Sequence, residues 1–309
     1  MRNLIFHIFV FFYFQTKKSR KGYRFFYCIL IQVIKMLNHI RFGQGITKQY
    51  FEVDVVISLT SYGKRIEDVF ITIESIFCGK ILPNRMILWL DNSYRHIEIP
   101  NTLKRLQKRG LEIRFTENIL SYKKLIPTLK SYPNSIIVTI DDDAIYSPYF
   151  LCHLLSSYAK HPNYIHANRV HKIKFDNKGQ IAKYLDWTWE VADEGPSALN
   201  VQTGVGGVLY PPHSLSEEVF NQDVFMDICQ FSDDIWFYAM GIMNGFCVYR
   251  VQIENNMKQD YIDMLEPKEQ ALSLLNTDPV VSKNDIQIRD VFRKYDICSQ
   301  ILHFKNNLT

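Results

Sequence analysis

Acidic residues are missing from the first 48 positions of the sequence, although the chain of 309 residues contains 32 Asp and Glu. The same segment holds nine of the 36 Lys and Arg residues, which leaves 27 basic against 32 acidic groups, a net charge of −5, for the remainder. The overall charge of +4 therefore belongs to one segment. Because the remainder is acidic, nucleic acid is not an expected partner.

Long hydrophobic runs are also lacking. The apolar run Leu4–Phe14 has eleven residues, well short of the roughly 20 that span a bilayer. KKSRKGYR follows it, where a signal peptide would have a small-residue cleavage site. A second run, Phe25–Leu37, is interrupted by Gln32 and Lys35.

Apolar stretches beside Lys and Arg favour contact with an anionic membrane surface. We therefore expect a cytoplasmic protein that lies peripherally on the inner face of the cell membrane through residues 1–48. The alternative for this segment is a helical cap that packs on the domain and has a solvated basic face.

Only six cysteines are present, and none forms a C-x-x-C pair or has a zinc-like spacing to histidine. They indicate a reducing cytosol, with the thiols mostly buried as small hydrophobes. Glycine and proline are too sparse to mark a flexible linker. We expect the basic apolar segment at 1–48, one main domain at 49–255 and a helical C-terminal tail packed on it at 256–309.

From residue 53 the pattern alternates between strand and helix. Apolar runs predict strands at 53–60, 86–91, 111–116 and 135–140, and amphipathic runs predict helices at 69–79, 101–109, 122–132 and 149–160. Such a pattern is typical of an α/β fold with a mostly parallel central sheet flanked by helices. Beyond it we expect paired strands around the turn at 177–179, a strand at LDWTWE (185–190) and a helix that begins near Ser232.

The most unusual stretch is SIIVTIDDDAIY, in which a buried strand ends in Asp141, Asp142 and Asp143. Adjacent ionised carboxylates raise one another's pKa unless a cation lies among them. On a strand Asp141 and Asp143 would share a face, while Asp142 would point to another partner. Mg²⁺ and Mn²⁺ commonly bind one or two carboxylates plus substrate phosphates, so we predict a Mn²⁺ or Mg²⁺ site at Asp143 and Asp141.

The acidic triplet has three alternative interpretations. A calcium loop is excluded, because Ile145 and Tyr146 stand where a third oxygen ligand and a glycine are needed. A phosphatase with an aspartyl nucleophile remains open, although Thr or Val would be expected at Ile145. Acids that only cap a helix or bind solvent are the remaining alternative.

Six segments occur in an order that resembles bacterial family-2-like glycosyltransferases with a GT-A fold. They are ISLTSYGKRI, RMILWLD, LSYKKLIPTLKSYP, IIVTIDDDAIY, QTGVGGVLYPP and SDDIWFYAMGI, within residues 53–255, and SKNDIQIRDVF at 282–292 extends the series. Residues 1–48 lie outside this resemblance. It implies that residues 49–255 form a GT-A catalytic domain that transfers a sugar from a nucleoside-diphosphate donor.

The resemblance also implies roles for individual residues. Asp143 matches the metal ligand and Asp141 the ribose side of the donor, and Lys123 or Lys124 would lie near the diphosphate, unless these lysines form a solvated helix face. The full set of donor-binding residues that we expect is Thr60, Ser61, Tyr62, Arg65, Asp91, Lys123, Lys124, Asp141 and Asp142.

Transfer to an acceptor hydroxyl requires a base, for which Asp234 and Asp233 are the candidates. We expect Ser232 to cap their helix and the helix dipole to keep both carboxylates ionised and only weakly basic. The alternative is a plain N-terminal capping cluster. Here the resemblance favours the base, because it places an acidic pair on the acceptor side.

The glycine-rich segment TGVGGVLYPP lacks the G-K-[ST] of a phosphate loop. We interpret Gly204, Gly206 and Gly207 as a wall of the pocket, against the alternative of a simple strand-entry turn. Trp187 is a candidate for the same wall, with core packing the favoured role of Trp187 and Trp189.

The three histidines His166, His171 and His213 are expected to be hydrogen-bonded structural groups. Metal ligation by one of them, as in some GT-A enzymes, is the minor alternative.

These observations predict a metal-dependent glycosyltransferase that transfers a sugar, from a UDP-sugar donor and with inversion, to a lipid-linked or oligosaccharide acceptor in bacterial surface-polysaccharide synthesis. A retaining enzyme and a non-catalytic nucleotide- or carbohydrate-binding protein remain alternatives. A nucleotidyltransferase fits poorly, because TSYGKRI has one glycine where such enzymes carry a glycine-rich loop.

Overall fold

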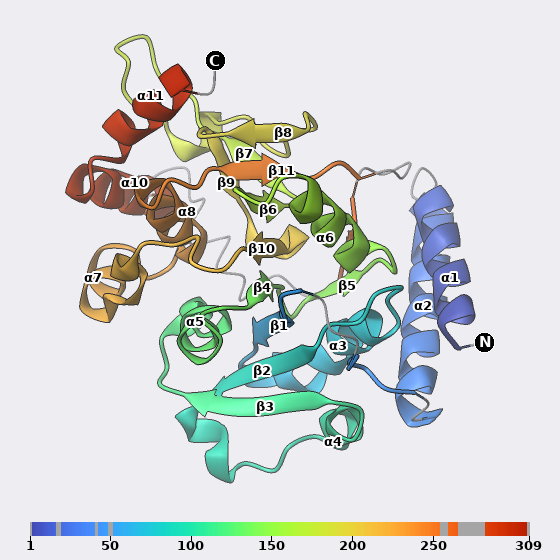
Figure 1. The fold of residues 1–309 in the computed structure, drawn as a ribbon. Helices are drawn as coiled ribbons and strands as arrows, with labels where there is room; N and C mark the ends of the chain where they lie inside the picture. The colour runs from blue at the N-terminus through green and yellow to red at the C-terminus, as the bar shows by residue number, and fades with distance from the viewer. Residues whose placement is uncertain are drawn as a thin grey trace.

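A computed structural model describes residues 2–16, 20–40, 43–48, 52–253, 259–264 and 282–307. The chain folds into an α/β structure in which helices flank a large central sheet (Figure 1). The C-terminal tail expected at 256–309 lies partly outside the described residues, and its described parts are one short strand and two helices.

The central sheet has eight strands among the described residues. Their order is β3 (Leu111–Thr116), β2 (Arg85–Asp91), β1 (Val55–Thr60), β4 (Ile136–Thr139), β10 (Val208–Tyr210), β6 (Ile165–Ala167), β11 (Val248–Arg250) and β8 (Gly195–Ser197). β3, β2, β1 and β4 are mutually parallel, as are β6 and β11, whereas β10 and β8 are antiparallel to their neighbours. The predicted mostly parallel sheet is therefore confirmed.

Side-chain alternation explains why β1 lies at the centre of the parallel half. Val55, Ile57 and Leu59 join the core under α3 (Val69–Phe77) and α4 (Asn101–Gln107). Val56 points to the opposite face. Because both faces are covered, the strand is buried along almost its whole length and is mostly apolar, which is what made it recognisable in the sequence.

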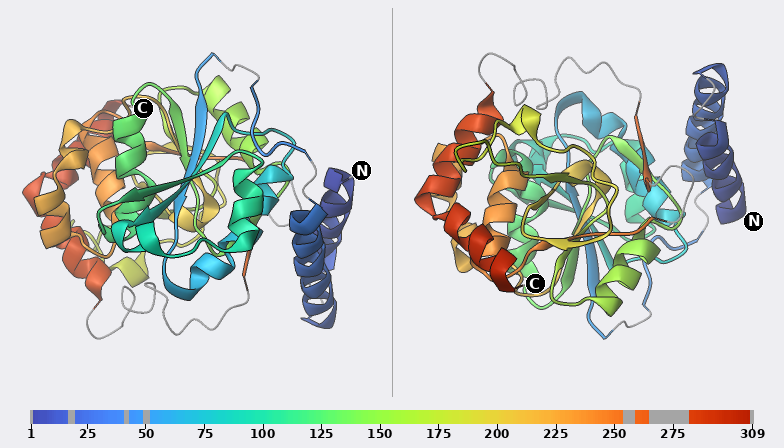
Figure 2. Two further views of the ribbon diagram at one scale, coloured as in Figure 1. Left: turned by 90° about the horizontal axis from the view of Figure 1, so that it is seen from below. Right: turned by 90° about the horizontal axis from the view of Figure 1, so that it is seen from above.

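Further helices and two small sheets lie around the central sheet (Figure 2). The remaining helices are α5 (Ile126–Ser131), α6 (Phe150–Lys160), α7 (Gln222–Ile228), α8 (Asp233–Met243), α10 (Lys283–Lys294) and α11 (Ile297–Asn307). Two small sheets pair β5 (Ala144–Tyr146) with β12 (Tyr261–Asp263) and β7 (Val170–Lys172) with β9 (Asn200–Gln202). α8, α10 and α11 cover the antiparallel half of the sheet.

Several predicted elements are corrected. The helix expected at 122–132 is divided into a 3₁₀ turn, Leu120–Lys124, and α5, because Pro127 can stand only in the first turn of a helix. The strand expected at LDWTWE is a 3₁₀ turn, Tyr184–Asp186, followed by a single bridge. Likewise, the paired strands around 177–179 are reduced to one bridge, between Phe175 and Ile181.

The N-terminal segment forms two helices, α1 (Arg2–Thr16) and α2 (Arg20–Ile40), that pack together as a hairpin. The hairpin lies on the opposite side of the molecule from α10 and α11 (Figure 2). Among the described residues, no helix has the length and apolar character needed to cross a bilayer.

None of the six cysteines forms a disulfide, in agreement with the scattered spacing. Cys78, Cys229 and Cys247 are buried, as expected, but Cys28 is exposed. The prediction was wrong for Cys28 because it lies on the outward side of α2.

A buried ion pair connects the start of the domain to α3 and α4. The guanidinium Nη1 of Arg109 donates to both carboxylate oxygens of Glu74, at 2.8 and 2.7 Å. The two side chains are 4% and 0% exposed. Arg109 also donates to the carbonyl of Gly43, and its own carbonyl accepts from Gly45. One arginine therefore fixes the segment after α2, the end of α4 and the middle of α3.

Replacing Glu74 with alanine is expected to lower the free energy of unfolding by about 3–5 kcal/mol, because Arg109 would stay buried without its counter-charge. Denaturant unfolding followed by circular dichroism measures this difference. The control is Glu98→Ala, which removes the exposed ion pair with Lys104 and should leave the unfolding midpoint unchanged. Equal losses in the two variants would contradict the role assigned to the buried pair.

Candidate active site

The expected site residues gather at one edge of the central sheet. β1 lies between β2 and β4, and all three run in parallel, so their carboxyl ends meet. Ser61 follows β1, Asp91 ends β2, and the acidic triplet follows β4 (Figure 1). Segments that are far apart in the sequence are brought together here by the strand order.

Asp142 is the buried member of the triplet. It accepts a hydrogen bond from the Ser61 hydroxyl at 2.6 Å and from the Arg65 guanidinium at 3.0 Å, and its backbone carbonyl accepts from Thr72 of α3 at 2.9 Å. Burial raises the pKa of Asp142, although Arg65 and Ser61 oppose this effect. Asp142 thus ties the turn after β1 to the turn after β4.

The triplet does not continue β4. The strand ends at Thr139, and the three aspartates occupy a turn that leads into β5, so the strand alternation used to assign their directions does not apply. Asp142 nonetheless has partners of its own, while Asp141 and Asp143 have side chains that are 29% and 38% exposed.

Asp143 combines partial exposure with an unfavourable electrostatic environment. Its carboxylate lies 3.2 Å from Nη2 of Arg65. Burial, followed by the charges of Asp141 and Asp142, raises the pKa of Asp143 to about 6, against the opposing effect of Arg65. A single arginine is therefore insufficient to neutralise this part of the site.

Lys124 lies at the centre of the cluster. Its Nζ is 3.0 Å from Asp141 Oδ1 and 3.1 Å from Asp233 Oδ2. Burial by itself would lower the pKa of Lys124, but the charges of Asp141, Asp233 and Asp234 outweigh it and raise the pKa well above its usual value. Lys124 is therefore a fixed positive charge between the triplet and the start of α8.

The glycine-rich segment lies directly against this ion pair. A Cβ on Gly204 would meet Lys124 Nζ at 2.7 Å and Asp141 Oδ1 at 2.9 Å, and one on Gly206 would meet Arg169 Cβ at 2.6 Å. Gly207 has φ = +80° and no room beside Phe150. Close approach therefore explains the glycines, and it places Gly204 beside the charged groups.

Tyr146 is a site residue that the sequence analysis did not identify. Its hydroxyl accepts from the backbone N–H of Asp141 and donates to the carbonyl of Val205, both at 3.1 Å. One buried phenol therefore fixes the triplet relative to the glycine-rich segment. Only its position shortly after the triplet could have pointed to it.

Asp233 and Asp234 begin α8, as expected, but their surroundings differ from the prediction. Ser232 stands at the N-cap without a side-chain capping bond. Asp234 Oδ2 accepts from the N–H of Gly204 at 3.2 Å. Burial and then the charge of Asp233 raise the pKa of Asp234 to about 7, although Lys124 opposes this. The expectation of a weakly basic carboxylate was wrong for Asp234, because burial and the charge of Asp233 raise its pKa.

The remaining donor-side residues lie around β1 and β2. The Thr60 hydroxyl donates to the backbone carbonyl of Trp89 at 2.8 Å, and the Tyr62 ring is exposed beside Arg65. Asp91 accepts from Ser93.

The side chains of the neighbouring residues Lys123 and Lys124 point to different partners. Lys123 Nζ donates to Asn118 at 2.8 Å and lies 3.9 Å from Asp91, whereas Lys124 points to the triplet. Burial lowers the pKa of Lys123, despite the charge of Asp91. Both lysines are buried, so neither belongs to a solvated helix face.

Trp187 is buried in the core beneath α8 and donates to the carbonyl of Ala182 at 3.0 Å. The core packing expected for both tryptophans is therefore confirmed for Trp187. It was wrong for Trp189, which is exposed and lies against Tyr184.

The three histidines make structural hydrogen bonds. His166 contacts Ser157 and the carbonyl of His161, and His171 accepts from the N–H of Glu190. His213 bonds the side chain of Asn134.

No three Asp, Glu, His or Cys side chains in the described part of the chain converge closely enough to hold a metal by themselves. The donor set nevertheless suits a cation that is shared with a phosphate-bearing substrate, as Mg²⁺ commonly is. Two basic side chains, Lys124 and Arg65, stand against five carboxylates: Asp141, Asp142, Asp143, Asp233 and Asp234. This surplus of negative charge is what an added cation would relieve.

Comparisons with known proteins give no close relative. No family model matches the chain, and no curated protein matches it. Among solved structures, the chain is similar to the inositol-1-phosphate CTP transferase from T. maritima, with 9% sequence identity, 84% of this chain and 98% of that chain covered, and a TM-score of 0.39. A similarity this remote supports no conclusion about function, and the resemblance to glycosyltransferases remains a prediction.

The raised pKa values of Asp143 (about 6) and Asp234 (about 7) predict how stability depends on pH. Both exceed the ordinary 3.8, so the native state binds more protons than the unfolded state. Their contribution to stability is therefore complete below this ordinary value and is lost as the pH rises through about 6 and 7. We expect Asp234→Asn to raise the Tm near pH 7 and to change it less at a pH below 4.

Thermal unfolding across this pH range measures the effect. The matched control is Asp193→Asn, which removes one exposed carboxylate outside the site and should leave the pH profile unchanged. If the profile of Asp234→Asn is parallel to that of the wild type, the unfavourable burial of this carboxylate is refuted.

Proposed function

We propose that the protein is a metal-dependent glycosyltransferase, which transfers a sugar from a nucleoside-diphosphate donor to a hydroxyl of a lipid-linked or oligosaccharide acceptor. The observation that carries the proposal is the position of Lys124 between Asp141 and Asp233. It joins the donor-side triplet at the end of β4 to the acidic pair at the start of α8, so both sides of a transfer reaction would share one pocket.

The donor diphosphate would bind beside the triplet. The partly exposed Asp143 and Asp141 would hold Mn²⁺ or Mg²⁺ together with diphosphate oxygens. When bound, such an ion neutralises the charge that grows on the departing diphosphate. Arg65 and Lys124 lie beside the same carboxylates and supply fixed positive charge to this side of the site.

The nucleoside would lie along the carboxyl ends of β1 and β2. There the exposed ring of Tyr62 offers a surface for stacking, and Asp91 offers hydrogen-bond acceptors. The donor in this proposal is a UDP-sugar, because Asp91 can accept from the N–H of a uracil ring.

Asp234 is the better candidate for the base. The carboxylate of Asp233 is paired with Lys124 at 3.1 Å, whereas the pKa of Asp234 is about 7, close to the value at which a base is most effective near neutral pH. In a single displacement, the acceptor oxygen bonds to the anomeric carbon as its proton passes to Asp234. The bond to the diphosphate oxygen breaks with its electron pair, and the configuration inverts.

The acceptor class, the role in surface-polysaccharide synthesis and the cytoplasmic place at the membrane belong to the same proposal. A lipid-linked acceptor would be available to an enzyme whose N-terminal helices contact the membrane surface.

Nucleotide binding tests the donor side. With UDP in large excess over its dissociation constant, we expect the Tm to rise by about 5 °C or more, and only when Mn²⁺ or Mg²⁺ is present. Asp143→Asn should remove the metal-dependent part of this rise, while Asp193→Asn should preserve it. Differential scanning fluorimetry with a panel of nucleoside diphosphates and triphosphates is the measurement. Indifference to every nucleotide, with or without metal, would sink the proposal.

Turnover tests the acceptor side. Asp234→Asn should retain metal-dependent UDP binding but lose about 10²–10⁴-fold in the rate of UDP release from a UDP-sugar in the presence of a glycolipid extract. For the wild type, kcat/KM should fall as the pH drops below about 7, where Asp234 becomes protonated. Binding without UDP release would indicate a non-catalytic binding protein, and pyrophosphate release from a nucleoside triphosphate would indicate a nucleotidyltransferase.

A further inference from the structure

Helix α1 carries apolar side chains on both its buried and its exposed side. Phe6, Val10 and Tyr13 are buried against the rest of the protein. Yet the opposite side, which faces solvent, presents Leu4, Ile8, Phe11 and Phe12. These positions follow helical spacing, so they form one continuous stripe along the helix. A helix that is apolar on two opposite sides is normally covered on both, and the part of the chain that the structure describes leaves this stripe exposed.

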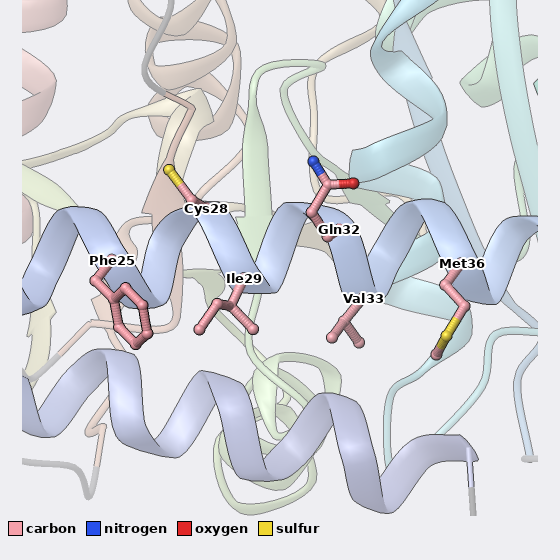
Figure 3. Close-up of a pocket in the computed structure, with 6 residues that line it drawn as sticks. All are labelled: Phe25, Cys28, Ile29, Gln32, Val33 and Met36. Carbon is pink, nitrogen blue, oxygen red and sulfur yellow. The ribbon is translucent and has the colours of Figure 1, made fainter.

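Helix α2 adds a second exposed apolar edge beside the first. Figure 3 shows Phe25, Ile29, Val33 and Met36 on the side of α2 that faces α1. They line an open groove of about 350 Å³. Phe25 and Met36 are exposed, as is Ile40 farther along the helix. The two helices therefore share one apolar outer face, which we call the hairpin face: Leu4, Ile8, Phe11, Phe12, Phe25, Ile29, Met36 and Ile40.

The hairpin is held firmly on the domain, so its outer face cannot simply turn inward. His7 Nε2 hydrogen-bonds the carbonyl of Cys78 at 2.9 Å. Asn38 is buried in α2, donates to the carbonyl of Thr102 at 3.2 Å and accepts from Arg105 at 2.8 Å. These contacts fix both helices against α3 and α4.

The charge around the hairpin face identifies the partner that it fits. Residues 1–48 hold nine Lys and Arg and no acidic residue, while the rest of the chain has a net charge of −5. Arg24 and Lys35 are exposed on α2 next to the apolar edge, and the sequence between the helices is Lys17-Lys18-Ser19. An exposed apolar face on a segment whose charged residues are all basic is complementary to an anionic lipid surface, which offers acyl chains beneath phosphate groups.

We propose that the hairpin face lies in the headgroup region of an anionic bilayer, with its Phe, Leu, Ile and Met side chains among the upper acyl chains and its Lys and Arg side chains at lipid phosphates. The helices would lie on the bilayer rather than across it, because none of the described helices is both long enough and apolar enough to span it. α1, with 15 residues, is about 22 Å long against a hydrocarbon core of about 30 Å. This inference rests on the proposed function in that it makes specific the membrane contact named there. No residue of the candidate active site takes part, so its failure would leave the proposed chemistry untouched.

Vesicle flotation of the full-length protein tests the proposal. Vesicles of equal parts phosphatidylcholine and phosphatidylglycerol should bind the protein, and phosphatidylcholine alone should bind it far more weakly. The triple variant Leu4→Ser, Phe11→Ser, Phe25→Ser replaces side chains that are 60%, 58% and 61% exposed. It should lose at least about thirtyfold in partitioning, because apolar burial in the bilayer is removed.

A matched control separates this face from general surface hydrophobicity. Ile97→Ser, Leu185→Ser, Leu302→Ser removes three exposed apolar side chains that lie outside the hairpin and should leave partitioning unchanged. Arg24→Gln with Lys35→Gln should lower binding to the anionic vesicles by about fivefold for each residue. Since all these residues are exposed, the far-ultraviolet circular dichroism and Tm should match the wild type.

Three outcomes overturn the proposal: no binding to anionic vesicles, binding that does not depend on phosphatidylglycerol, and an equal loss in the control triple variant. If the wild type ignores vesicles but forms a dimer that the hairpin variant abolishes in light-scattering chromatography, a second copy covers the face instead.

Discussion

The site depends on the placement of one buried ammonium group. Without Lys124, the carboxylates of Asp141, Asp233 and Asp234 would be left to repel one another in a poorly solvated region. The position of Lys124 also restricts residue 204, which lies next to it in space. Position 204 must lack a Cβ, because the Cβ of an alanine there would clash with both Lys124 and Asp141. A single ion-pair arrangement therefore determines residues from three distant parts of the sequence.

That arrangement also connects the two halves of the molecule. Lys124 and Asp141 belong to the parallel half of the sheet, whereas Asp233 begins α8, which packs under the antiparallel half. Tyr146 adds a neutral link, since its hydroxyl joins the triplet to the glycine-rich segment before β10. The charge of Asp141 also raises the pKa of Asp234, so a change of charge at Asp141 would shift the protonation of Asp234 at the start of α8.

Local signals predicted the parallel half of the fold well. β1 and β2 were predicted within two residues of their bounds, because strands buried on both faces leave runs of mostly apolar residues. The edge strand β3 is only partly buried and was predicted with its observed bounds, 111–116, because apolar and polar side chains alternate along it. The acidic triplet was recognisable because it directly follows an apolar run. Tyr146 and the partners of Lys124 were missed, because their contacts join residues brought together only by the strand order. Trp187 and Trp189 illustrate the same limit. Two tryptophans in one short segment were both expected to pack in the core, yet Trp187 is buried and Trp189 is exposed.

The negative charge of the candidate active site and the positive charge of the N-terminal helices constrain what each of them can bind. A diphosphate brings more negative charge to a site in which carboxylates already outnumber basic groups, so it can bind tightly only if a cation enters with it. An anionic bilayer would repel the acidic body of the protein for the same reason, yet attract the basic N-terminal helices. The charge distribution would thus orient the molecule on such a bilayer, with the hairpin toward the lipid. The hairpin is fixed on α3 and α4. Thr72 joins α3 to the acidic triplet, and Arg109 joins α3 to the segment after α2. Because of these links, the active-site edge of the sheet would keep one defined inclination to the membrane.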